Sequence, residues 1–318
     1  MARSKGDVAA LDPAASLPRR EPGPFDRLMS SVLRGGRTWA SHVLVAPTSA
    51  WLVVFLLAPI LLILIMSFTA RGPYGMLLWR FTTANYVRAL TPAYLPILLR
   101  SLGYAGATTA LCLLLGYPFA YALSFYFEER RGMLIILLML PFWTSCLVAI
   151  YSWIIVLGRE GLVNELLVHR WGLLSAPIQF LNRPATVIGG LVYFYLPFMV
   201  LPLYGSLEKV PAAYIEAAKD LGANPFQTFW RVTWPLSLPG VYAGSILTFI
   251  PCVGDFLTAE FLGGPRTYLL GNLIQNQFQM AQDWPFGSAM AMILVALLAG
   301  GLVLYQRLER QGAEAGRV

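Results

Sequence analysis

The chain has 318 residues, of which 57% are hydrophobic and only 12% are charged, with a formal net charge of +7. A soluble globular domain carries about 25% charged residues, and a domain of this size still needs a polar shell in water. The composition therefore excludes a soluble globular protein and predicts that lipid surrounds most of the chain. With 3 cysteines, 28 glycines and 22 prolines, a disulfide scaffold and a collagen-like or disordered chain are also excluded.

The first 43 residues are polar and contain prolines, and no long apolar stretch precedes Val43. A secretory signal peptide would need such a stretch ahead of its cleavage site. We therefore expect residues 1–43 to form a disordered cytosolic tail and not a cleaved signal peptide.

Six charge-free stretches, each at least 23 residues long, follow this tail. A helix needs about 20 apolar residues to cross a bilayer, and prolines are tolerated where neighbouring helices supply partners for the freed carbonyls. The sequence thus predicts an all-α polytopic membrane protein with about six transmembrane helices. Trimmed of their polar ends, the predicted spans cover 46–68, 98–124, 133–157, 186–207, 238–257 and 286–306.

The distribution of lysine and arginine predicts the orientation of these helices. If the N-terminus lies inside, 15 basic residues fall on the inner side of the membrane and 8 on the outer side. Basic residues accumulate on the cytoplasmic side, so we expect both termini, including a short tail over 307–318, in the cytoplasm. Because basic residues that flank spans are topology signals, the charge of +7 requires no nucleic-acid partner.

The loop between the fourth and fifth spans, residues 206–235, is predicted to lie in the cytoplasm and to contain two short helices. Residues 214–221 are good helix formers that follow Pro211, and Gly222 can adopt the left-handed conformation that ends a helix. A second amphipathic stretch covers 226–232.

Three aromatic side chains of this second stretch, Phe226, Phe229 and Trp230, are expected to be exposed. They could anchor the loop in a groove of a partner protein. Equally, the loop could be a connector that lies on the membrane surface. The residues by themselves leave both alternatives open.

The same loop resembles a motif of known proteins. Residues 216–218 (Glu-Ala-Ala), Gly222 and residues 232–235 (Val-Thr-Trp-Pro) resemble the EAA loop of ABC importer permeases, E-A-A-x3-G-x9-I-x-L-P, with Val for Ile and Trp for Leu. In that family the loop docks into a groove of the ATPase subunit and transmits its opening and closing. The resemblance implies that the ATPase-coupling residues are Glu216, Ala217, Ala218, Asp220 and Gly222.

Longer segments narrow the resemblance to the spermidine/putrescine permease subunits. One departure is Ala149, where relatives commonly carry an arginine ahead of a Tyr-x-Trp sequence. The resemblance implies a type I ABC importer permease fold, with the first helix and a periplasmic segment over 44–95 and a permease core over 96–306 that contains the coupling loop 208–235. The segments that carry it are 100–122, 141–164, 192–208 and 245–287.

The resemblance also implies a function and a set of partners. The chain would be the permease subunit of an ATP-driven importer in the inner (plasma) membrane, moving a putrescine- or spermidine-like polyamine from periplasm to cytoplasm by alternating access. The implied partners are a second homologous permease, two copies of an ABC ATPase subunit, a periplasmic substrate-binding protein and membrane lipid. The alternative cargo is an opine, an amino-acid derivative or another small organic solute, because specificity resides largely in the binding protein.

Two acidic residues, Asp255 and Glu260, close the fifth span. A carboxylate at membrane depth is costly and marks a pathway or a partner, and with Phe256 beside them these acids could receive an ammonium group. The alternative is that both acids are solvated at the outer interface. Tyr151 and Trp153 are further candidates for the substrate path, although aromatics at span ends are often interfacial anchors.

The polar run from Asn272 to Gln279 is too hydrophilic for lipid contact, so we expect it to face a translocation cavity or the surface of the binding protein. Asp283 is predicted to begin the sixth helix, where a negative charge is favourable.

The sequence predicts no enzymatic chemistry. It contains no G-x4-G-K-[ST] motif, so ATP hydrolysis is left to a separate subunit. His42 and His169 are far apart and beside no plausible nucleophile, and the three cysteines fall inside apolar spans, so we expect no catalytic residues, no metal and no cofactor. Two distant alternatives are a membrane-embedded transferase that uses Asp255 and Glu260, and a channel or sensor whose inner loop binds a signalling partner.

Overall fold

The computed structural model describes residues 39–315. Residues 1–38, which make up most of the predicted tail, and residues 316–318 lie outside the described residues. Residues 39–43 of the predicted tail are helical, and the last helix continues through residues 307–315. The chain divides into two units, residues 1–61 and 62–318.

Six runs of helix in the described part of the chain are long and apolar enough to cross a membrane, as predicted. Their ends agree with the predicted ends most closely for the first and fourth spans, because polar residues or prolines bound those stretches sharply. The six runs cover Ala46–Ser67, Leu95–Phe125, Cys146–Arg170, Pro184–Leu207, Pro225–Gly254 and Trp284–Val303.

Shorter helices and one two-stranded sheet join these runs. The strands β1 and β2 pair antiparallel, with Ala70 opposite Leu78. In chain order the elements are α2 (Trp39–Ser67), β1 (Ala70–Arg71), η1 (Pro73–Gly75), β2 (Leu77–Leu78), α3 (Ala84–Ala89), α4 (Leu95–Phe125), η2 (Glu128–Arg130), α5 (Arg131–Trp143), α6 (Cys146–Leu157), α7 (Leu162–Asn164), η3 (Glu165–Arg170), α8 (Pro184–Leu207), α9 (Ala212–Asp220), α10 (Pro225–Thr228), η4 (Phe229–Thr233), α11 (Trp234–Gly254), α12 (Leu257–Leu262), η5 (Pro265–Thr267), α13 (Leu270–Gln279) and α14 (Trp284–Ala315).

The prediction of one continuous third span over 133–157 was wrong, because the helix breaks between α5 and α6. Thr144 has an extended backbone (φ −83°, ψ 143°), and its hydroxyl donates to the Leu140 carbonyl over 2.9 Å. Pro141 lacks an N–H and so weakens the last turn of α5 as well. A side chain that bonds a nearby carbonyl offers the backbone an alternative to continuing the helix. The membrane-length run therefore begins at Cys146.

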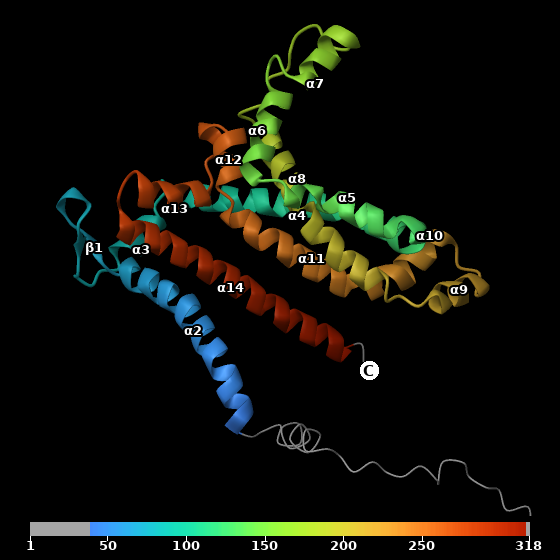
Figure 1. Ribbon diagram of the computed structural model, residues 1–318, viewed down its shortest axis with the longest axis horizontal. Helices are drawn as coiled ribbons and strands as arrows, with labels where there is room; N and C mark the ends of the chain where they lie inside the picture. The colour runs from blue at the N-terminus through green and yellow to red at the C-terminus, as the bar shows by residue number, and fades with distance from the viewer. Residues whose placement is uncertain (1–38, 316–318) are drawn as a thin grey trace, which may run out of the picture. The chain divides into compact units, whose positions relative to one another are not determined.

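Helices α4, α8 and α11 pack together at the centre of residues 62–318 (Figure 1). Small residues let α11 approach α8 closely: a Cβ on Gly240 would lie 2.5 Å from the Ser206 Cβ, and one on Gly244 would lie 2.9 Å from the Met199 carbonyl oxygen. Two glycines four residues apart on one helix face commonly mediate such contacts in membranes. Leu203 of α8, which is fully buried, lies at the contact with Gly240.

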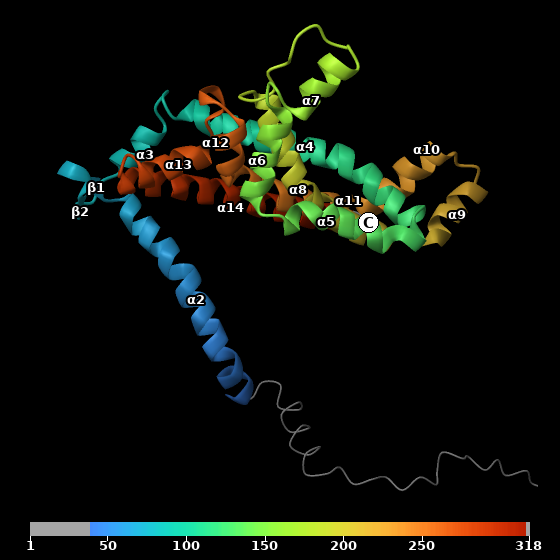
Figure 2. The same cartoon turned by 45° about the horizontal axis from the view of Figure 1, so that its top comes forward.

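The helices of the loop between α8 and α11 and the segment between the first and second spans lie at opposite ends of this bundle. Figures 1 and 2 show α9 and α10 at one end, and β1, α3 and the start of α14 at the other. This arrangement agrees with a chain in which α8 and α11 run between two sides of a membrane.

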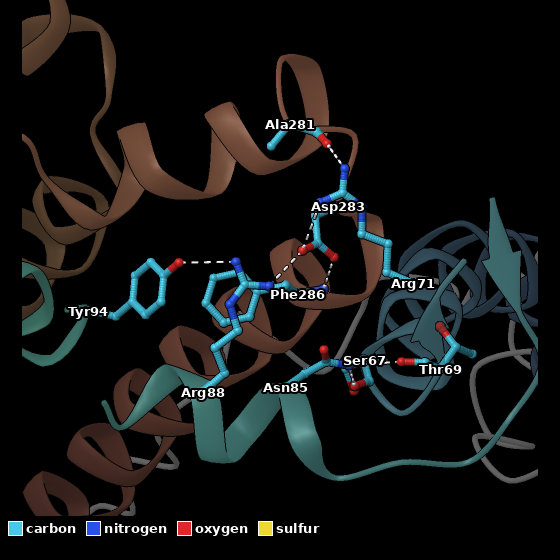
Figure 3. Close-up of polar contacts among 9 residues, drawn as sticks. All are labelled: Ser67, Thr69, Arg71, Asn85, Arg88, Tyr94, Ala281, Asp283 and Phe286. Atoms are coloured by element: carbon cyan, nitrogen blue, oxygen red, sulfur yellow. Dashed lines mark hydrogen bonds and ion pairs between the residues drawn. The ribbon is translucent and has the colours of Figure 1, made fainter. Parts of the chain in front are cut away.

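Two arginines of the segment between the first and second spans bind one carboxylate at the start of α14 (Figure 3). The Arg88 guanidinium donates to Asp283 over 2.7 Å, and an Arg71 nitrogen lies 3.6 Å from the same oxygen. Arg88 also donates to the Tyr94 hydroxyl over 3.1 Å and lies 4.0 Å from the centre of the Phe286 ring. The prediction that Asp283 begins the last helix is confirmed, because the Phe286 N–H donates to its carboxylate over 3.3 Å.

The environment of Arg88 favours its charged form. Burial lowers the pKa of the guanidinium, but hydrogen bonds to Asp283 and Tyr94 raise it by more, so that the net pKa lies above its ordinary value. The contact between Arg88 and Asp283 is therefore an ion pair at every pH at which the carboxylate is ionised.

Candidate functional site

The loop between α8 and α11 has the local structure that its sequence predicts. α9 begins directly after Pro211, and Gly222 has a φ of +81°, a left-handed conformation that favours glycine. A capping box starts α10: the Gln227 N–H donates to the Asn224 side chain over 2.8 Å, and the Asn224 N–H donates to the Gln227 side chain over 3.0 Å. The turn between α9 and α10 is thus fixed by backbone conformation and not by packing.

Four of the five predicted coupling residues lie on α9, which buries none of its side chains, and the fifth, Gly222, follows the end of this helix. Glu216, Ala217 and Asp220 are exposed, and Ala218 is half-buried. Among the described residues, neither acid forms an ion pair. A short exposed helix with small residues on one face and free carboxylates beside them can enter a groove of another protein without first breaking internal contacts.

The prediction of three exposed aromatics in this loop was partly wrong. Phe226 and Trp230 are exposed, but Phe229 is half-buried and points into the bundle. Its ring lies 5.6 Å from the Tyr117 ring of α4 and 6.2 Å from the Trp234 ring of α11. Tyr117 lies far away in sequence, so its contact with Phe229 could not be read from the loop. Phe229 therefore joins the loop to two of the three central helices.

A polar contact at the other end of the loop escaped the sequence analysis. The Glu208 carboxylate, next to the end of α8, accepts from Arg131 of α5 over 3.0 Å and from the Tyr204 hydroxyl over 2.9 Å. A hollow of about 600 Å³ lies beside it, between the ends of α8 and α11, and Lys209 and Pro239 belong to its lining. The base of the loop is thus tied to α5 as well as to α8.

The two candidate substrate-path acids lie around the bend that follows α11. The span ends at Gly254 and not at the predicted 257, and Asp255 makes the turn into α12. Its carboxylate accepts from the Tyr195 hydroxyl of α8 over 3.0 Å, from the Thr258 N–H over 2.9 Å and from the Thr258 hydroxyl over 3.2 Å. Because three donors already bind it, the Asp255 carboxylate holds the bend in place.

Glu260 is the more open of the two acids. It is exposed on α12, and one of its oxygens accepts from the Asn272 amide over 2.8 Å. The same amide donates to the Phe256 carbonyl over 2.9 Å. The second carboxylate oxygen of Glu260 has no hydrogen-bond partner among the described residues.

This contact corrects the prediction for the polar run of α13. Asn272 is only 2% exposed and Gln277 is 7% exposed, so neither faces a cavity or a partner. Asn272 instead satisfies the backbone at the bend, where Phe256 lies outside regular helix. The hydrophilic residues of α13 therefore serve two purposes: some form hydrogen bonds inside the protein, and others are at least partly exposed on its surface.

The two aromatic candidates of α6 point in different directions. The Tyr151 ring lies 5.6 Å from Phe261 of α12, whereas the Trp153 ring lies 5.6 Å from Tyr193 of α8. Two residues apart on a helix, they cannot share a face. The structure therefore brings Tyr151 to the helix that carries Glu260, whereas the Trp153 ring packs on Tyr193 of α8.

The described residues contain no group of three or more His, Cys, Asp or Glu side chains arranged to hold a metal ion. Cys112 and Cys252 are buried free thiols.

Comparison with known proteins gives the family. Residues 28–311 match the profile of a family described as "Binding-protein-dependent transport system inner membrane component". The chain belongs to this family. The resemblance inferred from the loop and the longer segments is thereby confirmed.

Relatives within this transport family are similar over most of their length. The spermidine/putrescine transport system permease protein PotB of Haemophilus influenzae is 43% identical over 265 residues, which cover 83% of this chain and 92% of the relative. PotB of Escherichia coli is 43% identical over 261 residues, covering 82% and 94%. A subunit of a bacterial alginate ABC transporter, solved with an alginate-bound periplasmic protein, has the same fold, with a TM-score of 0.65 and 19% identity over 90% of this chain and 98% of that one.

Membership of this family makes the chain the permease subunit of an ABC importer and a multi-pass protein of the inner membrane, as the sequence predicted. The six membrane-length runs agree with that location.

Proposed function

We propose that this permease carries a small cationic organic solute of the putrescine and spermidine type from periplasm to cytoplasm. The observation that carries the proposal is the pair of acids around the bend after α11, which have no lysine or arginine partner among the described residues. The names of the PotB relatives support the same class of cargo.

The energetic argument concerns uncompensated negative charge. A carboxylate near the membrane interior is costly unless a cation pairs with it. Asp255 is bound only by neutral donors, and Glu260 keeps one oxygen free. An ammonium group of the cargo would supply the missing charge. Phe256, next to Asp255 in the sequence, and Tyr151, which contacts Phe261 of α12, are the candidate cation–π partners.

Within this proposal the two acids have different tasks. Glu260 receives the ammonium group, because it is exposed and only one of its oxygens is bound. Asp255 keeps the bend between α11 and α12 in the geometry that presents Glu260. Trp153 lines a neighbouring part of the path, where its ring packs on Tyr193 of α8.

We further propose that α9 docks on a separate ATPase subunit through Glu216, Ala217 and Ala218. The exposure of this helix and the tethers at Glu208 and Phe229 support this role. Motion of the ATPase would then be transmitted to α5, α4 and α11, and the translocation path would open to one side of the membrane and then to the other. The complete importer would contain a second permease, two ATPase copies and a periplasmic binding protein, with both termini of this chain, including residues 1–43 and 307–318, in the cytoplasm.

The proposal is tested by uptake of labelled putrescine and spermidine, at low concentration, in cells that lack this gene. We expect the wild-type gene to restore uptake. We expect Glu260→Gln to raise the KM for spermidine about tenfold, because one charged contact with the cargo is lost. Glu160→Gln, a change in an exposed acid just after α6, is the matched control and should behave like the wild type. If deletion of the gene left uptake of both polyamines unchanged, the proposed cargo would be wrong, whereas the family assignment would stand.

A further inference from the structure

A small hollow lies at the end of the first span, on the segment that joins it to the second. Its volume is about 300 Å³, and its walls come from the last turn of α2 and from the chain after β2. The Phe68 and Phe81 rings, which both belong to its lining, stack on each other with centroids 5.3 Å apart and planes 9° apart. The lining residues are Ile65, Phe68, Thr69, Trp79, Arg80 and Phe81.

The side chains at its mouth are unusual for a surface in water. Trp79 is 79% exposed and Phe81 is 77% exposed, and Arg80 stands between them, also exposed. Among the described residues, the Arg80 guanidinium has no hydrogen bond, no ion pair and no ring beneath it. An unpaired cation between two exposed aromatics combines one positive charge with a large apolar area.

The hollow is a built feature, because the segment that forms it is fixed on both sides. The Thr82 N–H donates to the Phe68 carbonyl over 2.8 Å, and the Asn85 amide donates to the carbonyls of Ser67 and Thr69 over 3.0 and 2.9 Å. The ion pairs with Asp283 then hold the same segment to the start of α14 (Figure 3). The walls of the hollow therefore keep their shape without a ligand.

We propose that this hollow binds an anionic phospholipid, with its phosphate on Arg80 and the upper part of an acyl chain along Ile65 and Phe68. The end of a transmembrane run is where lipid headgroups meet the protein; Trp side chains are enriched at that level, and Arg side chains near helix ends reach to it. The charge of Arg80 complements a phosphate, and the apolar wall matches an acyl chain. The hollow is too small for a folded partner to enter.

The test uses the permease purified with its partner subunits in mild detergent and exchanged into mixed phosphatidylglycerol and phosphatidylcholine. Native mass spectrometry then counts each lipid retained. We expect wild-type protein to retain phosphatidylglycerol preferentially and Arg80→Gln to lower that preference about fivefold, the contribution of one basic residue near a membrane surface. Arg183→Gln, which removes another exposed arginine where a different span begins, should leave the preference unchanged.

A second variant tests the apolar part of the site. Phe81→Ala should reduce retention of both lipids, because it opens one wall of the hollow. Equal phosphatidylglycerol retention by the wild type and Arg80→Gln would overturn the proposal. The proposal would also be overturned if both variants retained lipid like the wild type but bound the periplasmic binding protein more weakly, since the surface would then be a protein-binding site.

Discussion

Asp283 is a carboxylate with only 2% of its side chain exposed, and two arginines from a distant part of the sequence bind it. The two arginines are not equivalent. Arg88 is 2.7 Å from the carboxylate and also packs on the Phe286 ring, whereas Arg71 is 3.6 Å away. The geometry therefore predicts that Arg88 contributes most of the compensation for the buried charge.

Replacement of Arg88 by Met should lower the free energy of unfolding by about 2–3 kcal/mol, because a buried carboxylate loses its main donor. Replacement of Arg71 by Met should cost about 0–1 kcal/mol, as for other exposed pairs. Thermal unfolding of the detergent-solubilised protein compares the two. Equal losses would show that the carboxylate does not distinguish its two partners.

Sequence reasoning reached only half of this site. It predicted that Asp283 begins the last helix, because an acid ahead of an apolar run is a local signal, and the Phe286 N–H confirms it. It did not predict the arginine partners, since no local pattern joins Arg88 to a residue so far along the chain. The partners of Asp255 and Glu260, Tyr195 and Asn272, were missed for the same reason.

At the scale of elements, local chemistry was informative where it acts on the backbone. Gly222 was expected to end α9 and does so at a φ of +81°. The break between α5 and α6 was not expected, because both sides are apolar and a charge-free stretch gives no sign of where a helix stops. Composition therefore locates spans, whereas interruptions inside them depend on individual prolines and hydroxyl side chains.

Gly222→Val should abolish transport while the protein still assembles with its partners. Nothing lies within 4 Å of a Cβ at this position, so the penalty comes from the left-handed backbone and not from a clash. A β-branched residue disfavours that conformation, whereas asparagine tolerates it, so Gly222→Asn should retain most activity. Uptake assays, with co-purification of partner subunits as the measure of assembly, separate these outcomes. Normal uptake by the valine variant would remove the turn from the coupling path.

At the scale of the whole of residues 62–318, α8 and α11 connect the two candidate sites. Halfway along α8, Tyr195 binds Asp255, which lies just beyond the end of α11. At the other end of α11, Phe229 and Glu208 tie the loop to the same bundle. Between these points the two helices meet at Gly240. We infer that relative motion of α8 and α11 is the step that would pass a signal from the loop to the acids. The sequence predicted both sites and the spans that bear them, but not Phe229 as a link, because that link requires the packing of three helices.

The contact at Gly240 can be tested with a matched pair of substitutions. Gly240→Ala would place a Cβ 2.5 Å from the Ser206 Cβ and 2.7 Å from the Pro202 carbonyl oxygen, and forcing the helices apart should cost about 1–3 kcal/mol. Gly205→Ala, on the facing helix with nothing within 4 Å of its Cβ, should instead be neutral or stabilise by about 0.5–1 kcal/mol, as expected for alanine within a helix. Thermal unfolding measures this difference in stability between the two variants, and uptake assays compare their transport. If Gly240→Ala is as stable and as active as Gly205→Ala, the two helices separate at this point in the assembled importer, and the signal must travel through α4 and Phe229 instead.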